Sequence, residues 1–164
     1  MGSQGRAEIP GRVREARVKD LDRVAALWSA ITEHHAPLDP LWTMRAAVGD
    51  ELRALLADLQ REPTVAIFVY EDRDDLPGMC IVRIDRSPPI LEETRRAEIT
   101  DIGVREDRRR QGIASVLLGE ALHWVDGQRV SRVEVQVARA NAEGQAFWRA
   151  RGFDPLMDVL HKRL

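Results

Sequence analysis

The order of hydrophobic and polar residues predicts one short strand and two helices in the first part of the chain. Polar and apolar residues alternate over 12–17, as in a short strand. Asp20 offers an N-cap, and apolar residues then follow at helical spacing until about His34. The prolines within 34–42 cannot continue a helix, so this segment is expected to link the first helix to a second one over 48–59.

The middle of the chain has the pattern of strands, followed by one long helix. Residues 64–71 are apolar on both alternating faces, as in a central strand, and 78–84 reads as the strand that returns from a hairpin. A charged loop then leads to a strand over 97–104. The helix expected over 113–125 is apolar almost all round, which predicts burial against the sheet, and Gly127 is expected to end it as a left-handed cap.

The last part of the chain predicts a strand over 133–137, a helix that contains Trp148 and ends at Gly152, and a closing strand over 159–164. The resulting order of elements is β-α-α-β-β-β-α-β-α-β, which implies a mixed α/β sheet wrapped by helices. Residues 1–11 are small and polar and contain no signal peptide, so they read as a disordered leader or an artificial remnant. The remaining residues, 12–164, fit a single domain.

Composition narrows the class of protein. Hydrophobic residues make up 44% and charged residues 32%, as in a soluble globular protein. The net charge of −2 disfavours a nucleic-acid partner, and no apolar run is long enough for a membrane span. Cys80 is the single cysteine, which excludes an internal disulfide and favours a reducing cytoplasm. Its apolar neighbours indicate a buried core residue rather than a nucleophile.

The segment from Arg108 to Ala114 carries the strongest chemical signal. It lies between a predicted strand and a predicted helix, where successive backbone N–H groups at the positive end of the helix can cradle a phosphate. Gly112 and Ala114 would keep this cradle open, because a larger side chain would hold a pyrophosphate away from the backbone. The arginines would add mobile charge at its lip. Three consecutive arginines alone would indicate only a solvated loop.

The surrounding sequence makes the signal specific. The strand at 97–104 comes before the turn, and the block 141–153 after it contains an asparagine and ends in Gly-Phe. This combination resembles the GNAT superfamily of N-acetyltransferases, whose acetyl-CoA signature Arg/Gln-x-x-Gly-x-Gly/Ala is matched by Arg109, Gly112 and Ala114. The resemblance implies an α/β acyl-CoA N-acyltransferase fold, with a mixed, mostly antiparallel sheet that splays between the fourth and fifth strands, and about four flanking helices. It implies acetyl-CoA as cosubstrate and no metal.

The resemblance also assigns coenzyme contacts. The pantetheine arm is expected to pair with the fourth strand as an added strand would, and a backbone N–H near Val104 to polarise the thioester carbonyl. Gly103 is expected to form the bulge that splays the two strands, the alternative being a packing glycine in an ordinary strand. Asn141 would contact the pantetheine or cap its helix. The implied coenzyme-binding residues are Ile102, Gly103, Val104, Arg109, Arg110, Gln111, Gly112, Ile113, Ala114, Ser115, Asn141 and Trp148.

Two carboxylates are candidates for the base that deprotonates the acceptor amine. Glu98 and Asp101 lie on the same predicted strand, where side chains three apart point to opposite faces unless a bulge intervenes. Glu98 matches a glutamate that some members of the resembled family use as base, and other members have an acid at the position of Asp101. Glu98 is favoured and Asp101 is kept as the alternative. Each could instead be a strand-edge carboxylate paired with an arginine.

The chain departs from the resembled family at Trp148, where many members have a tyrosine that protonates the departing thiolate. An indole N–H is too weak an acid for this role. Tyr70, the single tyrosine, is expected in the core. A coenzyme thiol with a pKa of about 8.5 can leave as a thiolate without much help. The expected activity is therefore direct attack of an amine in a ternary complex, and a non-catalytic acyl-CoA-binding module is the alternative.

The acceptor is expected to be a primary amine of a small molecule or peptide. Scattered acidic residues would suit a cationic acceptor, and the frequency of dimers in the resembled family makes a homodimer an option. His34, His35 and Asp39 do not have the spacing of a metal site. Together with Trp42, the histidines could shape the acceptor pocket, or this segment could be only a capped helix end packed on the core.

Overall fold

A five-stranded sheet organises the chain, as shown by a computed structural model that describes residues 9–38, 43–162 and 164. The strands lie in sequence order, and all neighbours are antiparallel except β4 and β5, which are parallel. The mixed, mostly antiparallel sheet expected from the sequence is therefore confirmed. The strands are β1 (Arg12–Glu15), β2 (Val65–Asp72), β3 (Asp75–Arg86), β4 (Arg95–Val104) and β5 (Val133–Val135).

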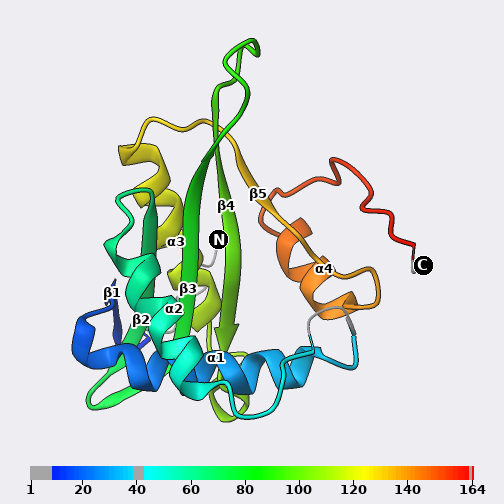
Figure 1. Cartoon of the computed structure of the whole chain (residues 1–164). Coiled ribbons are helices and arrows are strands. Elements are labelled where there is room, and N and C mark those ends of the chain that lie inside the picture. The colour runs from blue at the N-terminus through cyan, green and yellow to red at the C-terminus, as the bar shows by residue number, and fades with distance from the viewer. Residues whose placement is uncertain (1–8, 39–42, 163) are drawn as a thin grey trace, which may run out of the picture.

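Helices cover both faces of this sheet (Figure 1). Helices α1 and α2 lie on one face, α3 lies on the other, and α4 lies beside β5. None of the helices within the described ranges is both long and apolar enough to cross a membrane. The helices are α1 (Leu21–His35), α2 (Gly49–Arg61), α3 (Ile113–Gly127) and α4 (Ala142–Arg149), with short 3-10 turns η1 (Val18–Asp20) and η3 (Glu106–Arg108).

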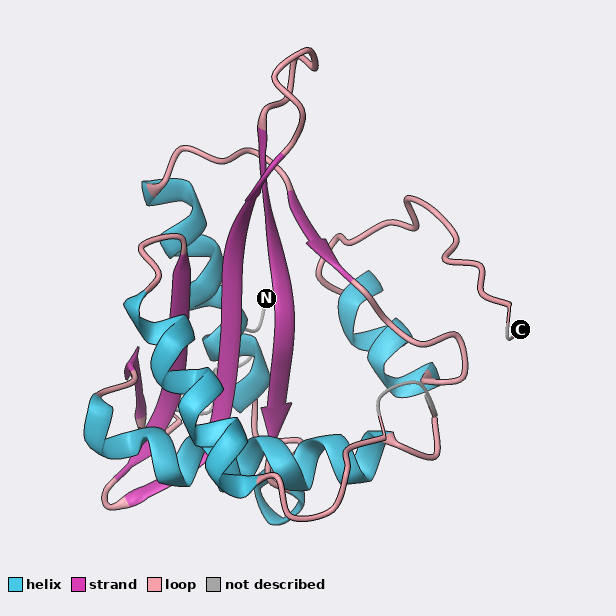
Figure 2. Cartoon of the chain, in the orientation of Figure 1, coloured by secondary structure: helices cyan, strands magenta, loops and turns pink. Residues whose placement is uncertain are grey.

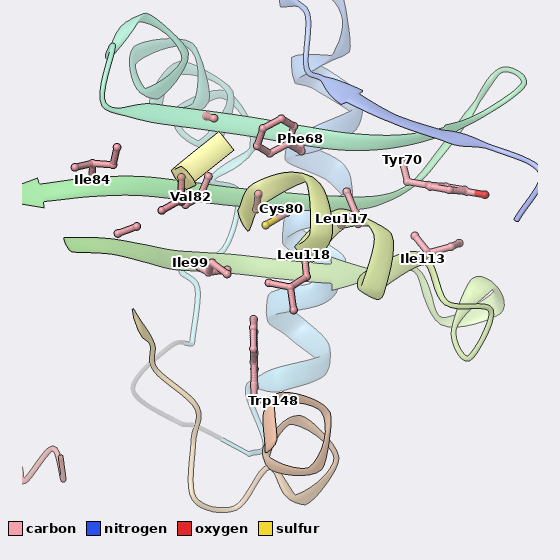
Figure 3. Packing of buried hydrophobic residues seen from close by; sticks show 14 of the residues in the cluster. Phe68, Tyr70, Cys80, Val82, Ile84, Ile99, Ile113, Leu117, Leu118 and Trp148 are labelled. Atoms are coloured by element: carbon pink, nitrogen blue, oxygen red, sulfur yellow. The ribbon is translucent and has the colours of Figure 1, made fainter. Parts of the chain in front are cut away.

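The sheet separates two hydrophobic clusters, because successive residues of a strand point to opposite faces. Phe68 and Cys80 pack with Leu117 on the α3 side (Figure 3), while Ile67 and Leu56 belong to the cluster under α1 and α2. Burial raises the pKa of the Cys80 thiol well above its ordinary range. The expectation of a buried core cysteine is confirmed.

Asp20 occupies the position before α1, but its carboxylate bonds away from the helix. It is buried and accepts hydrogen bonds from the guanidinium of Arg14 and from the backbone N–H of Arg17, each at 2.7 Å. Arg14 also bonds Glu71 at 2.7 Å, and its hydrogen bonds lower the pKa of both carboxyls, that of Glu71 to about 2. Asp20 and Arg14 together therefore tie β1 and β2 to the start of α1, and the side chain of Asp20 does not cap the helix.

A bulge interrupts β4 at Thr100, and not at Gly103. The register of β3 with β4 shifts between Ile99 and Asp101, which leaves Thr100 as the extra residue. Gly103 remains in regular register opposite Met79. The prediction of a bulge at Gly103 is therefore wrong.

Gly103 is instead a packing glycine. A Cβ atom at this position would lie 2.4 Å from Cδ1 of Ile31 on α1, closer than any side-chain contact allows. The absence of a side chain thus lets α1 lie directly against β4. The structure therefore agrees with the alternative that the sequence left open, a packing glycine in an ordinary strand.

The ends of the last two helices differ in how well the sequence predicted them. Helix α3 ends at Gly127, but the left-handed residue that follows is Arg129, with φ of 57°. The predicted left-handed cap at Gly127 is therefore wrong. Gly152 does have a left-handed conformation, with φ of 82°, and its N–H donates to the carbonyl of Arg149 at 3.1 Å.

The predicted closing strand over 159–164 is absent from the described residues. The chain after Gly152 has no regular secondary structure as far as residue 162, and its apolar side chains are mostly exposed, 75% for Val159 and 90% for Leu160. Asp158 forms an ion pair with Arg139, which follows β5. Apolar character predicted a strand here, but a strand also requires a neighbour with which to pair.

Two residues of the predicted leader, Ile9 and Gly11, contact the rest of the described fold. Ile9 packs against the cluster on the α3 side, and the N–H of Gly11 donates to the hydroxyl of Tyr70 at 2.8 Å. Tyr70 is fully buried, as the sequence predicted. The rest of the predicted leader, 1–8, lies outside the described residues.

Adding a side chain at Gly103 should destabilise the fold through its contact with α1. Gly103→Ala is expected to lower the free energy of unfolding by about 1–3 kcal/mol, the usual cost of overpacking. In the double variant with Ile31→Ala the two effects should be less than additive, because the smaller residue makes room for the new methyl group. Urea unfolding followed by circular dichroism measures both.

Gly119→Ala is the matched control. Gly119 lies on the exposed side of α3 with no atom near the position of an added Cβ. This variant should gain up to about 1 kcal/mol from helix propensity. Equal destabilisation of both variants would contradict the packing role of Gly103.

Candidate active site

The fourth and fifth strands separate soon after they meet. Only Ala97–Ile99 of β4 pairs with Val133–Val135 of β5, and β4 continues to Val104 without this neighbour. Figure 2 shows the two strands diverging. The splay predicted by the family resemblance is confirmed. Backbone groups of residues 100–104 that face this opening have no strand of the described residues beside them, so an extended ligand could pair there.

A tight turn at the end of β4 leads into α3 and presents several backbone N–H groups. Arg110 and Gly112 both have left-handed conformations, with φ of 63° and 86°. Alternation of this kind points successive N–H groups into one concavity that suits an anion. The first intrahelical bonds are donated by Ser115 and Val116 to the Gly112 carbonyl, so the N–H groups before Ser115 lie in the unpaired first turn. The turn has the form of an anion cradle.

Ion pairs hold the base of this turn against the hairpin of β2 and β3. The guanidinium of Arg105 bonds both carboxylate oxygens of Asp75, at 2.7 and 2.8 Å, and Arg108 bonds Asp72 at 2.6 Å. The hydrogen bonds from Arg105 lower the pKa of Asp75. These two arginines therefore fix the backbone. Arg110 is the more exposed charge, with 85% of its side chain exposed and an ion pair to Glu143 at 3.2 Å.

Arg109, the first residue of the coenzyme signature, links the turn to both β4 and α1. Its Nε donates to the carbonyl of Val104 at 3.1 Å, and its Nη1 lies 2.8 Å from Nε2 of His34. The neighbouring His35 has a lowered pKa, first because of burial and then because of the charges of His34 and Arg109. Arg109 therefore positions the turn as well as bringing charge to it.

The remaining residues of the predicted phosphate turn have distinct environments. The hydroxyl of Ser115 accepts a hydrogen bond from Arg151, whose guanidinium lies 3.6 Å from the ring centre of Phe147. Gln111 is exposed and its side chain accepts a hydrogen bond from Arg108 at 3.2 Å. Ile113 is buried in the cluster on the α3 side, and the partly buried side chains of Ala114 and Ile102 pack against this cluster. Their side chains support the turn and the strand, so any coenzyme contact there would come from the backbone.

The bulge at Thr100 places both candidate bases on one face of the sheet. Ala97 and Ile99 point into the cluster on the α3 side, so Glu98 between them points toward α1 and α2. After the bulge, Asp101 also points this way and bonds a side chain of α1. In a regular strand, residues 98 and 101 would lie on opposite faces. The bulge therefore brings together two carboxylates that sequence spacing alone would separate.

The two carboxylates differ in their partners. Glu98 is 9% exposed, bonds the guanidinium of Arg83 at 2.6 Å, and accepts a hydrogen bond from the amide of Gln136 at 3.3 Å. Asp101 accepts a hydrogen bond from the indole of Trp28 at 2.7 Å. Burial raises the pKa of Asp101 above its ordinary value, and hydrogen bonds to Thr100 and Trp28 oppose this only in part.

The two predicted coenzyme contacts on and near α4 have structural partners. Asn141 caps the helix, because its Oδ1 accepts the N–H of Gly144 at 2.8 Å. Trp148 is 6% exposed and packs between Phe147 and Phe153, with ring centres 5.1 and 4.9 Å away. Figure 3 shows its ring directed toward Leu118. Helix capping therefore accounts for the position of the Asn141 side chain, and core packing accounts for that of Trp148, without a coenzyme.

No cluster of metal-binding side chains occurs among residues 9–38, 43–162 and 164. Asp39 and Trp42, considered with the histidines from the sequence, lie outside the described residues. A hollow of about 460 Å³ does lie along this segment, between the outer side of α1 at Ser29 and Glu33 and the residues from Thr43 to Gly49. None of the predicted catalytic or coenzyme residues lines it.

Three side chains that contact the candidate bases were missed by sequence reasoning. Trp28 was visible only as an apolar position of the first helix, although an indole facing a strand carboxylate can donate a hydrogen bond. Arg83 and Gln136 gave no signal, because cross-strand neighbours depend on register, and a bulge changes register.

The chain belongs to the acetyltransferase (GNAT) family, whose model matches residues 28–153. Members of this family transfer an acetyl group from acetyl-CoA, so the protein is an acetyl-CoA-dependent acetyltransferase. The matched region begins on α1 at Trp28, includes the bulge and the phosphate turn, and ends at Phe153. No curated protein sequence matches the chain.

Several solved structures share the fold at low sequence identity. A tetramutant of the BH1408 protein from Bacillus halodurans has a TM-score of 0.81 at 19% identity, covering 93% of this chain and 99% of that one. The aminoglycoside N-acetyltransferase AAC(6')-Iy in complex with CoA has a TM-score of 0.75 at 16% identity, covering 94% of each chain. A predicted acetyltransferase from Clostridium acetobutylicum with acetyl-CoA has a TM-score of 0.74 at 14% identity, covering 93% and 96%.

A side chain at Gly112 should weaken coenzyme binding. Gly112→Val would place a β-branched residue at a φ of 86°, with its Cβ 3.0 Å from Cδ1 of Ile9, so the backbone that forms the cradle would have to shift. The dissociation constant for coenzyme A is expected to rise at least tenfold, about 1.4 kcal/mol, in isothermal titration calorimetry. Unchanged affinity would show that the turn is not the phosphate site.

Gly152→Val controls for backbone strain. Gly152 has nearly the same φ, 82°, and no atom near the position of an added Cβ, but it follows α4. Both variants should lose stability through the left-handed conformation. Only Gly112→Val should also lose coenzyme affinity.

Proposed function

We propose that the protein transfers the acetyl group of acetyl-CoA to a primary amine of a small molecule or peptide by direct attack in a ternary complex. The observation that carries this proposal is the opening between β4 and β5, which has an anion cradle at one end and two carboxylates beside it. A coenzyme that spans the opening would bring its thioester to the side chains on the α1 face.

The coenzyme is proposed to lie along the free edge of β4. Its pyrophosphate would bind the backbone from Arg109 to Ser115, where N–H groups and the helix dipole favour an anion. Its pantetheine arm would pair with residues 102–104, which have no neighbouring strand on that edge. A backbone N–H near Val104 would then donate to the thioester oxygen as negative charge develops.

Asp101 is proposed as the proton acceptor, with Glu98 as its charged neighbour. The sequence favoured Glu98, but the oxygens of Glu98 are already bonded to Arg83 and Gln136. Asp101 has a raised pKa and, among the described residues, accepts one side-chain hydrogen bond from outside its own strand, which supports it as the stronger base. An ordinary amine has a pKa of about 10.4, so deprotonation near neutral pH costs about three units, or roughly 4 kcal/mol.

The reaction forms one bond and breaks another. The ammonium gives up one proton to Asp101, the free amine attacks the thioester carbon, and the carbon–sulfur bond then breaks to release the coenzyme as a thiolate. The second proton that the nitrogen loses as the amide forms passes to solvent. With a thiol pKa of about 8.5, this leaving group needs no protein acid. Buried Trp148 cannot supply one, and the hydroxyl of Tyr70, on β2, accepts a hydrogen bond from the N–H of Gly11.

The acceptor is proposed to be a cationic amine, and the reaction is proposed to take place in the cytoplasm. Two carboxylates on one face favour a positively charged substrate, and the aminoglycoside N-acetyltransferase AAC(6')-Iy of similar fold is named for a cationic class of amine. A panel of spermidine, kanamycin and an N-blocked lysine peptide, assayed for thiol release from acetyl-CoA, tests the proposal. Stabilisation by acetyl-CoA without turnover of any amine would indicate a non-catalytic binding module instead.

Removing the proposed base should produce a pH-dependent loss of activity. Asp101→Asn is expected to lower kcat/KM about 10²-fold near neutral pH, and the loss should shrink at higher pH as the free amine becomes abundant. A carboxylate accepts a proton only when ionised, so the wild-type rate should rise as pH increases through the pKa of Asp101.

Glu98→Gln is the matched comparison, because it keeps the size of the side chain and one acceptor oxygen while it removes the charge. It should lower kcat/KM less than about tenfold, with little change in the shape of the pH profile. If the glutamine variant shows the large pH-dependent loss and the asparagine variant does not, Glu98 is the base.

Neither Trp148 nor Tyr70 should act as an acid. Trp148→Phe and Tyr70→Phe are each expected to change kcat less than about tenfold, or under about 1.4 kcal/mol of barrier. Circular dichroism should first establish that each variant is folded. A loss of about 100-fold in Tyr70→Phe would show that the thiolate is protonated by the protein.

A further inference from the structure

A hydrogen bond between α1 and β4 holds the carboxylate of Asp101. The Nε1–H of Trp28 donates to Oδ1 of Asp101 over 2.7 Å. We propose that Trp28 is a positioning residue, which keeps Asp101 charged and directs its other oxygen, Oδ2, toward the acceptor amine. This inference rests on the proposed function, because the role belongs to that reaction.

The close contact between α1 and β4 makes this hydrogen bond possible. Ile31, one helical turn after Trp28, lies against the backbone of Gly103, where no side chain intervenes. Thr32 donates its hydroxyl to the carbonyl of Trp28 at 2.9 Å, within the same stretch of α1. The indole is half-buried and therefore held by packing, so the direction of its N–H is fixed by the fold.

The chemistry of the indole determines what Asp101 can do. An indole N–H donates and never accepts, so Oδ1 must remain an acceptor as long as the bond exists. A proton taken from an ammonium would therefore be bound at Oδ2. Hydrogen bonds to a charged acceptor are stronger than those to a neutral one, so the same contact favours the ionised carboxylate.

The groups around Asp101 act in opposite directions. Burial and the nearby charge of Glu98 raise its pKa, while Thr100, Trp28 and the charge of Arg83 lower it. Cys80 on β3 is also close enough to feel its charge, but this buried thiol stays neutral. Trp28 is the group on α1 that lowers the pKa of Asp101. Without its hydrogen bond, less would oppose the rise in pKa that burial causes, so more of the carboxylate would be protonated near neutral pH.

Direct titration of Asp101 tests the proposal without any substrate. In the wild-type protein, the indole Nε1–H resonance of Trp28 should shift with pH at the same midpoint as the ¹³C carboxyl resonance of Asp101. Asp101→Asn should abolish the shift of the indole resonance. An indole resonance that is indifferent to Asp101→Asn would overturn the proposal, and this measurement needs no variant of Trp28 that folds.

Trp28→Phe then removes the N–H and keeps an aromatic ring in place. The titration midpoint of Asp101 should rise by at least half a pH unit, about threefold in its acid dissociation constant. Trp124→Phe is the matched control, because Trp124 lies on α3 and packs into the cluster on the other face of the sheet. It should leave the midpoint unchanged. An unchanged midpoint in Trp28→Phe would also contradict the proposal.

Kinetics separate positioning from a merely structural role. With acetyl-CoA and the fastest amine of the panel, the acidic limb of kcat/KM in Trp28→Phe should move to higher pH by the same amount as the titration midpoint. The plateau at high pH should change less than about twofold. Uniform loss of activity at every pH would indicate a structural role. Absence of turnover in the wild type would contradict the proposed function, yet leave the titration result standing.

Discussion

The strict alternation of side chains along a strand is the constraint on which the candidate site depends. A single extra residue at Thr100 reverses that alternation within β4 and places Glu98 and Asp101 on the same face. The same reversal returns Ile102 and Val104 to the cluster on the α3 side. One irregularity thus brings two carboxylates together on one face and completes the packing on the other.

The second constraint is the close approach of α1 to the sheet. Without a side chain at Gly103, Ile31 lies on the strand backbone and Trp28 reaches the carboxylate of Asp101. The first helix is thereby part of the site, and not only a cover for the core. Arg109 makes a second connection from the phosphate turn to the end of this helix at His34. Contacts from α1 therefore reach both the phosphate turn and the carboxylates.

Charged residues near the turn serve mainly to hold its shape. Arg105 and Arg108 are committed to carboxylates of the β2–β3 hairpin, so the backbone that would bind phosphate is fixed from behind. Fixed N–H groups lose little freedom when an anion binds, which favours affinity. The arginines near the turn look like part of a solvated loop in the sequence. In the structure, Arg105 and Arg108 stabilise the conformation of the turn, and Arg110 is exposed.

The sequence by itself determined the family, the order of the elements as far as α4 and the position of the turn between β4 and α3, because periodicity, glycines and a short motif are local properties. Only the tertiary structure decided where the bulge lies, which partners Glu98 and Asp101 have, and that the apolar residues after Phe153 form no strand as far as residue 162. Those outcomes depend on register and on a neighbouring strand or helix. Such neighbours are distant in sequence, so no pattern along the chain encodes them.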